Sequence, residues 1–204
     1  GINTANANAV KVIVKIDDAE DINANKDVAV VLPAGTYTFT ETVESASLQV
    51  NNGNDVTINA NDNTLAVGTA NAYGFVAEGE GTTLEINDAN IDSKGGAIGA
   101  VDGAKVTVNN STVAVNSAST SGRYNVYVVG EGTEVTINGG VFSFSKTLNQ
   151  KRAYVYTGVG AKVIINDGTF GKASTRDDYK AGIKGDGETI IYGGTFGFNP
   201  TKIR

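Results

Sequence analysis

Short runs in which β-branched residues alternate with polar ones recur along most of the chain. Each run follows a glycine-marked turn and ends at an Asn in all but the last copy. Two or three small or polar residues and a second short apolar stretch come next. Because successive side chains of a strand point to opposite faces, this alternation predicts half-buried strands. The six copies span residues 55–67, 81–92, 103–115, 132–144, 160–171 and 187–198.

The copies repeat at a nearly constant spacing. The last strand residue before each turn is Ile or Val, and neighbouring members of this set are 22 to 29 residues apart. A period of roughly 20 to 50 residues that carries strands but no helical pattern is typical of a stacked solenoid. The sequence therefore predicts an all-β, parallel β-solenoid of about seven coils, each with three short strands. The marker residues are Ile58, Ile86, Val108, Ile137, Ile165 and Ile191.

Alternation within the strands predicts which side chains form the interior. We expect three rows that run along the stack, because equivalent residues of successive coils lie above one another. The third row begins aliphatic and becomes aromatic, which predicts a wider interior toward the C-terminus. The first row is Val56, Leu84, Val106, Val135, Val163 and Thr189, the second is the set of marker residues, and the third is Ile91, Val113, Phe142, Phe170 and Phe196.

The N-terminal part departs from the repeat. Residues 10–16 alternate as a half-exposed strand, and residues 17–27 form an acidic connection with one helical turn. Residues 28–32 are a short apolar run that ends at Pro33. We therefore divide the chain into an N-terminal segment with a cap strand, residues 1–27, and a β-helix domain, residues 28–204. No amphipathic helix follows Phe196 and Phe198, so we expect either that the native protein continues past Arg204 or that the C-terminal coil associates with a partner.

An Asn follows the marker residue in five copies, and Tyr192 takes its place in the last. Stacked coils would bring these amides into one row in which each bonds to the next. A buried unpaired amide costs on the order of 1 to 3 kcal/mol, so the row is interpreted as structural. Its members are Asn59, Asn87, Asn109, Asn138 and Asn166.

Composition narrows the function classes. The 204 residues carry a formal net charge of −6, and the chain contains no Cys, His, Met or Trp. An acidic chain without clustered Lys and Arg does not suit a nucleic-acid or anionic membrane surface. No run is apolar enough to cross a bilayer, and no export leader is recognisable. We expect no cofactor, no nucleic-acid partner and no membrane insertion.

The coil pattern resembles that of the pectate-lyase-like right-handed parallel β-helix superfamily. Residues 32–37, LPAGTY, resemble its common opening coil. The endings at residues 138–142, 167–170 and 193–200 look like repeats in adhesin-like surface proteins of gut Bacteroidales and in gut phage β-helix proteins. The resemblance implies a right-handed coil and an extracellular or cell-surface location. It does not specify an activity, because the superfamily includes lyases, hydrolases, adhesins and phage spikes.

An enzymatic function finds little support in the residues. Lyases of the superfamily use a calcium-binding group of carboxylates. Its hydrolases use three Asp residues and a His, and this chain contains no His. The two acidic doublets, Asp17-Asp18 and Asp177-Asp178, consist of adjacent residues that would point to opposite sides of a strand. The other acids stand at turns, where Asp satisfies backbone donors. The sequence therefore favours a non-catalytic protein without a metal site.

Basic residues, often beside Tyr, recur where each coil re-enters its first strand. Stacking would align guanidinium groups and phenol rings along one edge, where they could bind an extended glycan. The alternative is that the Tyr residues fill the core and the Arg residues only solvate an edge. Lys94 begins the series, and the candidate ligand-binding residues are Arg123, Tyr124, Arg152, Tyr154, Arg176 and Tyr179.

We thus expect a non-catalytic adhesion or glycan-binding module of a gut bacterial surface protein, with a polysaccharide or host glycan as partner. A phage tail or spike receptor-binding segment is the first alternative, and it would be a trimer. A polysaccharide lyase or hydrolase whose acids converge from separate coils is the second.

Overall fold

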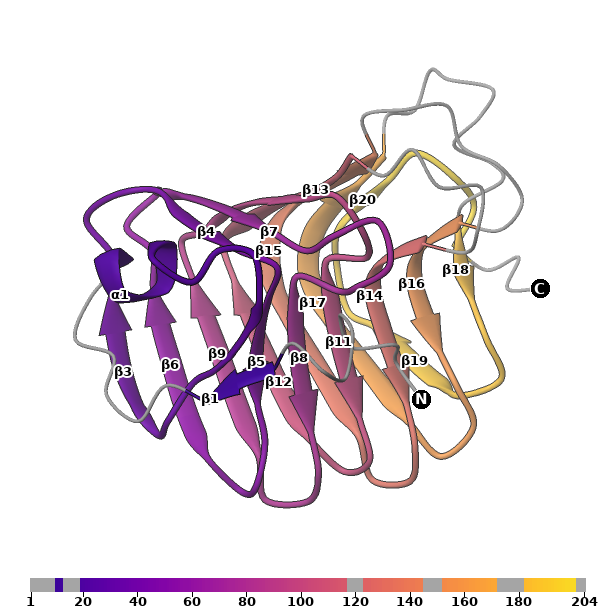
Figure 1. The fold of residues 1–204 in the computed structure, drawn as a ribbon. Helices are drawn as coiled ribbons and strands as arrows, with labels where there is room; N and C mark the ends of the chain where they lie inside the picture. Colours follow the sequence, from indigo (N-terminus) through magenta and orange to yellow (C-terminus); the bar gives the residue numbers. More distant parts are fainter. Residues whose placement is uncertain (1–9, 13–18, 117–122, 145–151, 172–181, 201–204) are drawn as a thin grey trace.

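The computed structural model describes residues 10–12, 19–116, 123–144, 152–171 and 182–200. Of the described residues, 59% are in strands and 3% in a helix, and the strands pair in parallel within two sheets. Successive coils stack side by side into a parallel β-helix, as the repeat predicts (Figure 1).

One face of the stack is an eight-stranded sheet, here called sheet A. Neighbouring strands in it come from successive coils, which is the arrangement that a solenoid requires. In order across the sheet, its strands are β1 (Val10–Val12), β2 (Ala29–Val31), β5 (Ser47–Val50), β8 (Phe75–Glu78), β11 (Ile98–Val101), β14 (Arg123–Val129), β16 (Arg152–Thr157) and β18 (Ile183–Lys184).

The other two faces belong to a twelve-stranded sheet, sheet B, whose two arms are joined by two long strands. These are β15 (Glu134–Phe144) and β17 (Lys162–Phe170). The first arm contains β3 (Gly35–Thr38), β6 (Asp55–Asn59), β9 (Thr83–Asn87), β12 (Lys105–Asn109) and β19 (Glu188–Ile191). The second contains β4 (Val43–Ser45), β7 (Thr64–Val67), β10 (Asn90–Ser93), β13 (Ser111–Val115) and β20 (Thr195–Phe196).

The stack amounts to about five turns, fewer than the seven predicted. The prediction counted the six copies and the irregular coil that precedes them. Strands of the first and last coils are short: β2 and β4 have three residues each, and β18 and β20 have two each. They add little to the regular ladder, which explains the difference.

The three interior rows are confirmed by the strand register. Val56 pairs with Leu84, which pairs with Val106, and the marker residues Ile58 and Ile86 pair in the same way. All members of the first five copies, residues 55–171, are buried, whereas Thr189, Ile191 and Phe196 of the last copy are half-buried. The third row runs Leu65, Ile91, Val113, Phe142, Phe170 and Phe196.

Aromatic rings stack in the core near the C-terminal end. The ring centroids of Phe142 and Phe170 are 4.6 Å apart, and those of Phe170 and Phe196 are 5.1 Å apart. Phe198 then turns inward, 8% exposed, with its ring 5.5 Å from that of Tyr154. Aromatic rings thus occupy the third row at this end, as the sequence predicts, and Phe198 covers part of the core there.

Two strands predicted as separate in the fourth copy are continuous in β15. The Asn-Gly-Gly at residues 138–140 does not end the strand, although the register with β17 shifts on both sides of Asn138. Gly139 and Gly140 have φ values of 130° and 106°, which side chains with a Cβ rarely adopt. The glycines therefore bend the strand from one arm of sheet B to the other, and the pairing with β17 resumes at Val141.

The first coil is covered by the short helix α1 (Ala19–Asn23). Its Ile22 is fully buried in the hydrophobic core, and the helix packs against β4. The helical turn lies within the predicted connection at residues 17–27. Of the strand predicted at residues 10–16, Val10–Val12 forms β1, and the remainder lies outside the described residues.

Candidate functional site

The Asn row lies on the outside of the stack, at the end of the first-arm strands of sheet B. Its amides form a continuous series of side-chain hydrogen bonds. Asn87 donates to Asn59 at 3.0 Å, Asn109 to Asn87 at 2.6 Å, Asn138 to Asn109 at 2.8 Å and Asn166 to Asn138 at 2.7 Å. The first three are half-buried and the last two exposed. The amides bind mainly one another, which suits a structural role.

The candidate ligand-binding residues predicted from the sequence do not form one surface. Arg123 and Arg152 are register partners on β14 and β16, as stacking predicts. Arg123 is half-buried, and its guanidinium donates a hydrogen bond to the carbonyl of Ala70. The side chain of Arg152, and all of Arg176 and Tyr179, lie outside the described residues.

Tyr154 does not line a surface, contrary to the prediction. It is 1% exposed, and its ring packs between Phe144 at 5.1 Å and Phe198 at 5.5 Å. The register explains this result. Tyr124 pairs with Ala153 rather than Tyr154, so the two tyrosines do not occupy equivalent positions in their coils.

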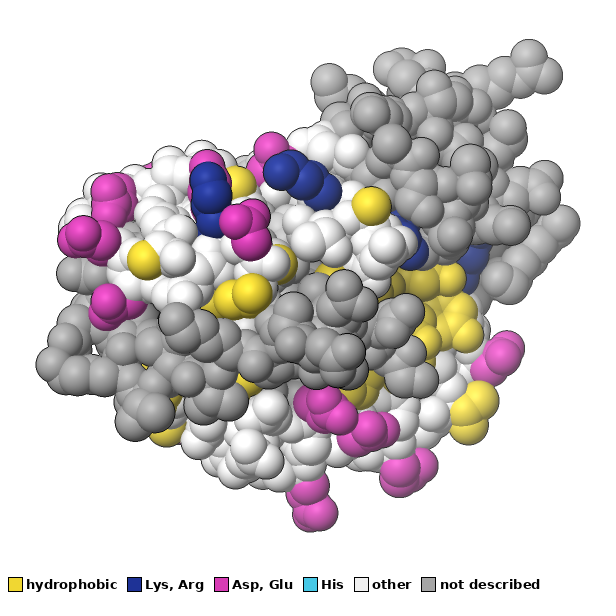
Figure 2. Space-filling view, in the orientation of Figure 1, with side chains coloured by type: hydrophobic (Ala, Val, Ile, Leu, Met, Phe, Trp, Pro, Cys, Tyr) yellow, Lys and Arg dark blue, Asp and Glu magenta, His cyan; other side chains and the backbone are white. Residues whose placement is uncertain are grey.

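Four tyrosines gather instead on the outer face of sheet A, and we call them the tyrosine ridge. They are Tyr73, Tyr124, Tyr127 and Tyr156, all half-buried. The rings of Tyr127 and Tyr156 stack at 5.2 Å with 14° between their planes, and Tyr124 stacks on Tyr127 at 5.3 Å. Tyr124 is also 5.2 Å from Tyr156, and Tyr73 is 5.6 Å from Tyr127. Figure 2 shows hydrophobic side chains gathered over β14 and β16.

Backbone packing holds Tyr73 in the ridge. A Cβ on Gly96 would lie 2.2 Å from the Tyr73 ring, so the ring rests on bare backbone. A Cβ on Gly95 would lie 2.0 Å from the carbonyl oxygen of Ala72, in the loop that precedes Tyr73. Arg123 holds the same loop through Ala70. The two glycines and Arg123 thus fix the first ring of the ridge.

The phenol groups of Tyr73, Tyr124 and Tyr127 stay protonated at neutral pH. Burial, followed by the neighbouring phenols Tyr124 and Tyr127, raises the pKa of Tyr73 well above its usual value. Burial and the phenol of Tyr156 raise the pKa values of Tyr124 and Tyr127 as well. Among the described residues, no hydrogen bond is recorded for the four phenol oxygens. They are therefore able to donate to and accept from a ligand.

Two ridge residues, Tyr127 and Tyr156, were not among the candidates from the sequence, although their spacing could have identified them. Tyr127 and Tyr156 are 29 residues apart, within the range of the coil spacing, and they pair in register. Each is also flanked by inward residues, Val126 and Val128 or Val155, so each points outward. Tyr73 had no such signal, because its position depends on the loop at residues 69–72.

Within the described ranges, no three acidic side chains gather closely enough to hold a metal ion. In the same ranges, α1 is the one helix, and its five residues are too few to cross a membrane.

The sequence matches no protein-family model, and no curated protein or solved structure is significantly similar to it.

Proposed function

We propose that this chain is a non-catalytic, carbohydrate-binding β-helix module of an extracellular or cell-surface protein. The observation that carries the proposal is the tyrosine ridge, four half-buried phenols stacked on the outer face of sheet A. The setting is supported by the resemblance of the coil endings to adhesin-like repeats.

The chemistry of the ridge suits a sugar chain. Because the rings stack on one another, their edges and hydroxyl groups rather than their faces meet a ligand. Ring edges carry the positive end of the ring quadrupole and contact the oxygen atoms of a sugar, whereas the phenol oxygens exchange hydrogen bonds with its hydroxyl groups. Aromatic side chains with a polar tip combine both contacts at a low entropic cost.

The length of the ridge favours an extended ligand. Tyr127 and Tyr156 come from neighbouring coils, whose strands lie about 4.8 Å apart. Tyr73, just before β8, extends the row on the other side of β14, while Tyr124 lies on the same strand as Tyr127 and widens it. A saccharide of two or more units would contact several rings at once. We expect such a chain to bind along the axis of the stack.

The test is binding of the purified chain to an array of bacterial, plant and host glycans, followed by calorimetry with the strongest glycan. The change Tyr127→Ala should weaken binding at least about tenfold, because it removes the central ring and its hydroxyl. Tyr127→Phe keeps the stack and should cause a smaller loss through the missing hydroxyl.

Tyr192→Ala is the matched control. Tyr192 is 74% exposed on the last coil and lies outside the ridge, so its removal should leave binding unchanged. Equal affinity of the wild type and Tyr127→Ala, with both folded by circular dichroism, would refute the proposal.

A further inference from the structure

We propose that a second site, separate from the ridge, binds a small zwitterionic ligand that carries one ammonium and one carboxylate group. The site is a pocket of about 360 Å³ at the turn from the second arm of sheet B to sheet A. Ligand pockets are typically about 300 to 1,000 Å³, so this one suits a small molecule. It is lined by Lys26, Asp27, Glu44, Ser45, Ala46, Ala66, Gly68, Thr69, Ala70 and Lys94.

The walls come from segments far apart in the sequence. Lys26 and Asp27 follow α1, Glu44 and Ser45 belong to β4, and Lys94 follows β10. The loop at residues 68–70 forms another wall, and Arg123 anchors it through the carbonyl of Ala70. This wall therefore has a fixed position, and the small residues between the charged ones leave the space open.

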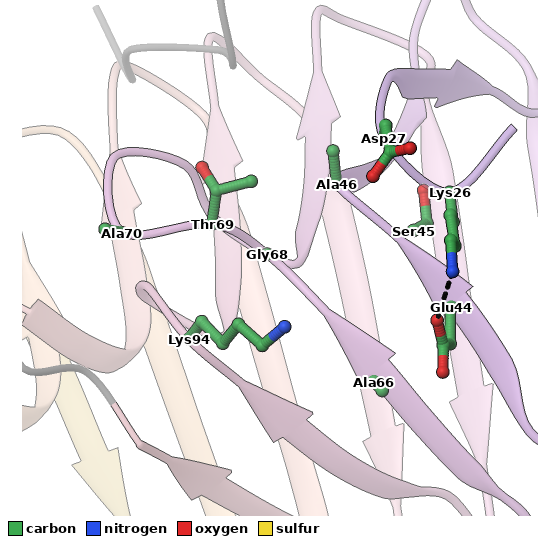
Figure 3. Close-up of a pocket in the computed structure, with 10 residues that line it drawn as sticks. All are labelled: Lys26, Asp27, Glu44, Ser45, Ala46, Ala66, Gly68, Thr69, Ala70 and Lys94. Atoms are coloured by element: carbon green, nitrogen blue, oxygen red, sulfur yellow. Dashed lines mark ion pairs between the residues drawn. The ribbon is translucent and has the colours of Figure 1, made fainter.

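Four charged side chains line the pocket, and two of them neutralise each other. The ammonium of Lys26 lies 3.7 Å from the carboxylate of Glu44, as Figure 3 shows. The structure records no hydrogen bond or ion pair for the side chains of Asp27 and Lys94, both exposed. Among described Lys and Arg side chains, Lys94 is the one cation without a recorded partner.

The two unpaired charges flank the same space. In Figure 3 the Lys94 side chain extends toward the pocket from one side, and the Asp27 carboxylate lies on the other. A ligand carboxylate beside Lys94 and a ligand ammonium beside Asp27 would make two charge-assisted hydrogen bonds. A purely anionic ligand would meet the carboxylates of Asp27 and Glu44, and a purely cationic one would meet Lys94, so the lining selects against both.

The experiment is an NMR titration of the ¹⁵N-labelled chain with β-alanine, γ-aminobutyrate and glycylglycine, which differ in the separation of their charges. Propionate and propylammonium are the singly charged comparisons. We expect amide shifts at residues 68–70 and Lys94, strongest for one of the three zwitterions. Both singly charged compounds should bind at least about fivefold more weakly.

The variants Lys94→Gln and Asp27→Asn should each weaken zwitterion binding about fivefold, since each removes one ion pair. Lys105→Gln and Asp186→Asn are matched controls, because both side chains lie outside the pocket lining. The double variant Asp27→Lys with Lys94→Asp reverses the dipole and should restore binding to within about twofold, with the ligand turned around.

Three results would overturn the proposal: no saturable shift with any zwitterion, equal binding of propionate, or a double variant no better than the single ones. The outcome is independent of the ridge, because the probes carry no sugar and no ridge residue is changed. Tyr127→Ala should bind the zwitterion as the wild type does.

Discussion

The Asn row and the tyrosine ridge are both rows of like residues on the outside of the same stack, but they leave different chemistry to the solvent. Each inner amide of the Asn row both donates to one neighbour and accepts from the next. The tyrosines pack through their rings, and no hydrogen bond is recorded among described residues for their hydroxyl groups. Repetition in a solenoid therefore identifies a row of like residues. Whether the polar groups of that row are already hydrogen-bonded to one another then distinguishes a structural row from a candidate binding site.

The cost of breaking the Asn row should be the largest effect. Asn109 donates to Asn87 and to Glu85 and accepts from Asn138. Asn109→Ala should lower the free energy of unfolding by about 2 to 3 kcal/mol, because several polar partners lose their hydrogen bonds together. Chemical denaturation measures this change.

Asn71→Ala is the control for that variant, since Asn71 is exposed and outside the row. If both variants lose the same stability, the hydrogen bonds of the row contribute nothing and the distinction from the ridge fails.

The contact between the Tyr73 ring and the backbone of Gly96 predicts an intermediate effect on stability. Gly96→Ala places a Cβ against the Tyr73 ring and should lower the free energy of unfolding by about 1 to 2 kcal/mol. In a Tyr73→Ala background the same change should cost close to nothing, because the obstructing ring is gone. A full cost in both backgrounds would show that Gly96 has another role.

Alkaline pH should have the smallest effect, and it should act through the ridge. The pKa values of Tyr73, Tyr124 and Tyr127 are raised in the folded state, mainly by burial. The unfolded chain then loses these protons first, so stability is intact below about pH 10 and declines as pH rises above it.

Denaturation between pH 8 and pH 11 measures the decline, with the triple variant Tyr73→Phe, Tyr124→Phe, Tyr127→Phe as reference. Its stability should fall less over this range than that of the wild type. Parallel curves for the two proteins would contradict the assignment of the raised pKa values to the ridge.

Much of the fold could be predicted, because alternation and period are local properties of the sequence. The interior rows from Val56 to Ile165 follow from which face of each strand is apolar, and the Asn positions follow from the period. The number of turns was less predictable, because the short end strands carry the pattern without extending the regular ladder.

The candidate site was predictable only in part. Arg123 pairs with Arg152 as expected, and Tyr124 belongs to the ridge. Tyr154 was misplaced because a difference of one residue in register moves a side chain to the other face of a strand. Tyr124 and Tyr127 are three residues apart, so strict alternation would separate them, yet their rings stack at 5.3 Å.

The sequence by itself determined that this chain is a β-solenoid with a continuous apolar interior, because recurring patterns need only short-range alternation and a constant period. The tertiary structure alone decided that Tyr73 joins the ridge and that Asp27 and Lys94 line one pocket. Those placements depend on how the loop at residues 68–72 packs on Gly95 and Gly96 and on Arg123, contacts between residues of different coils that no local pattern encodes.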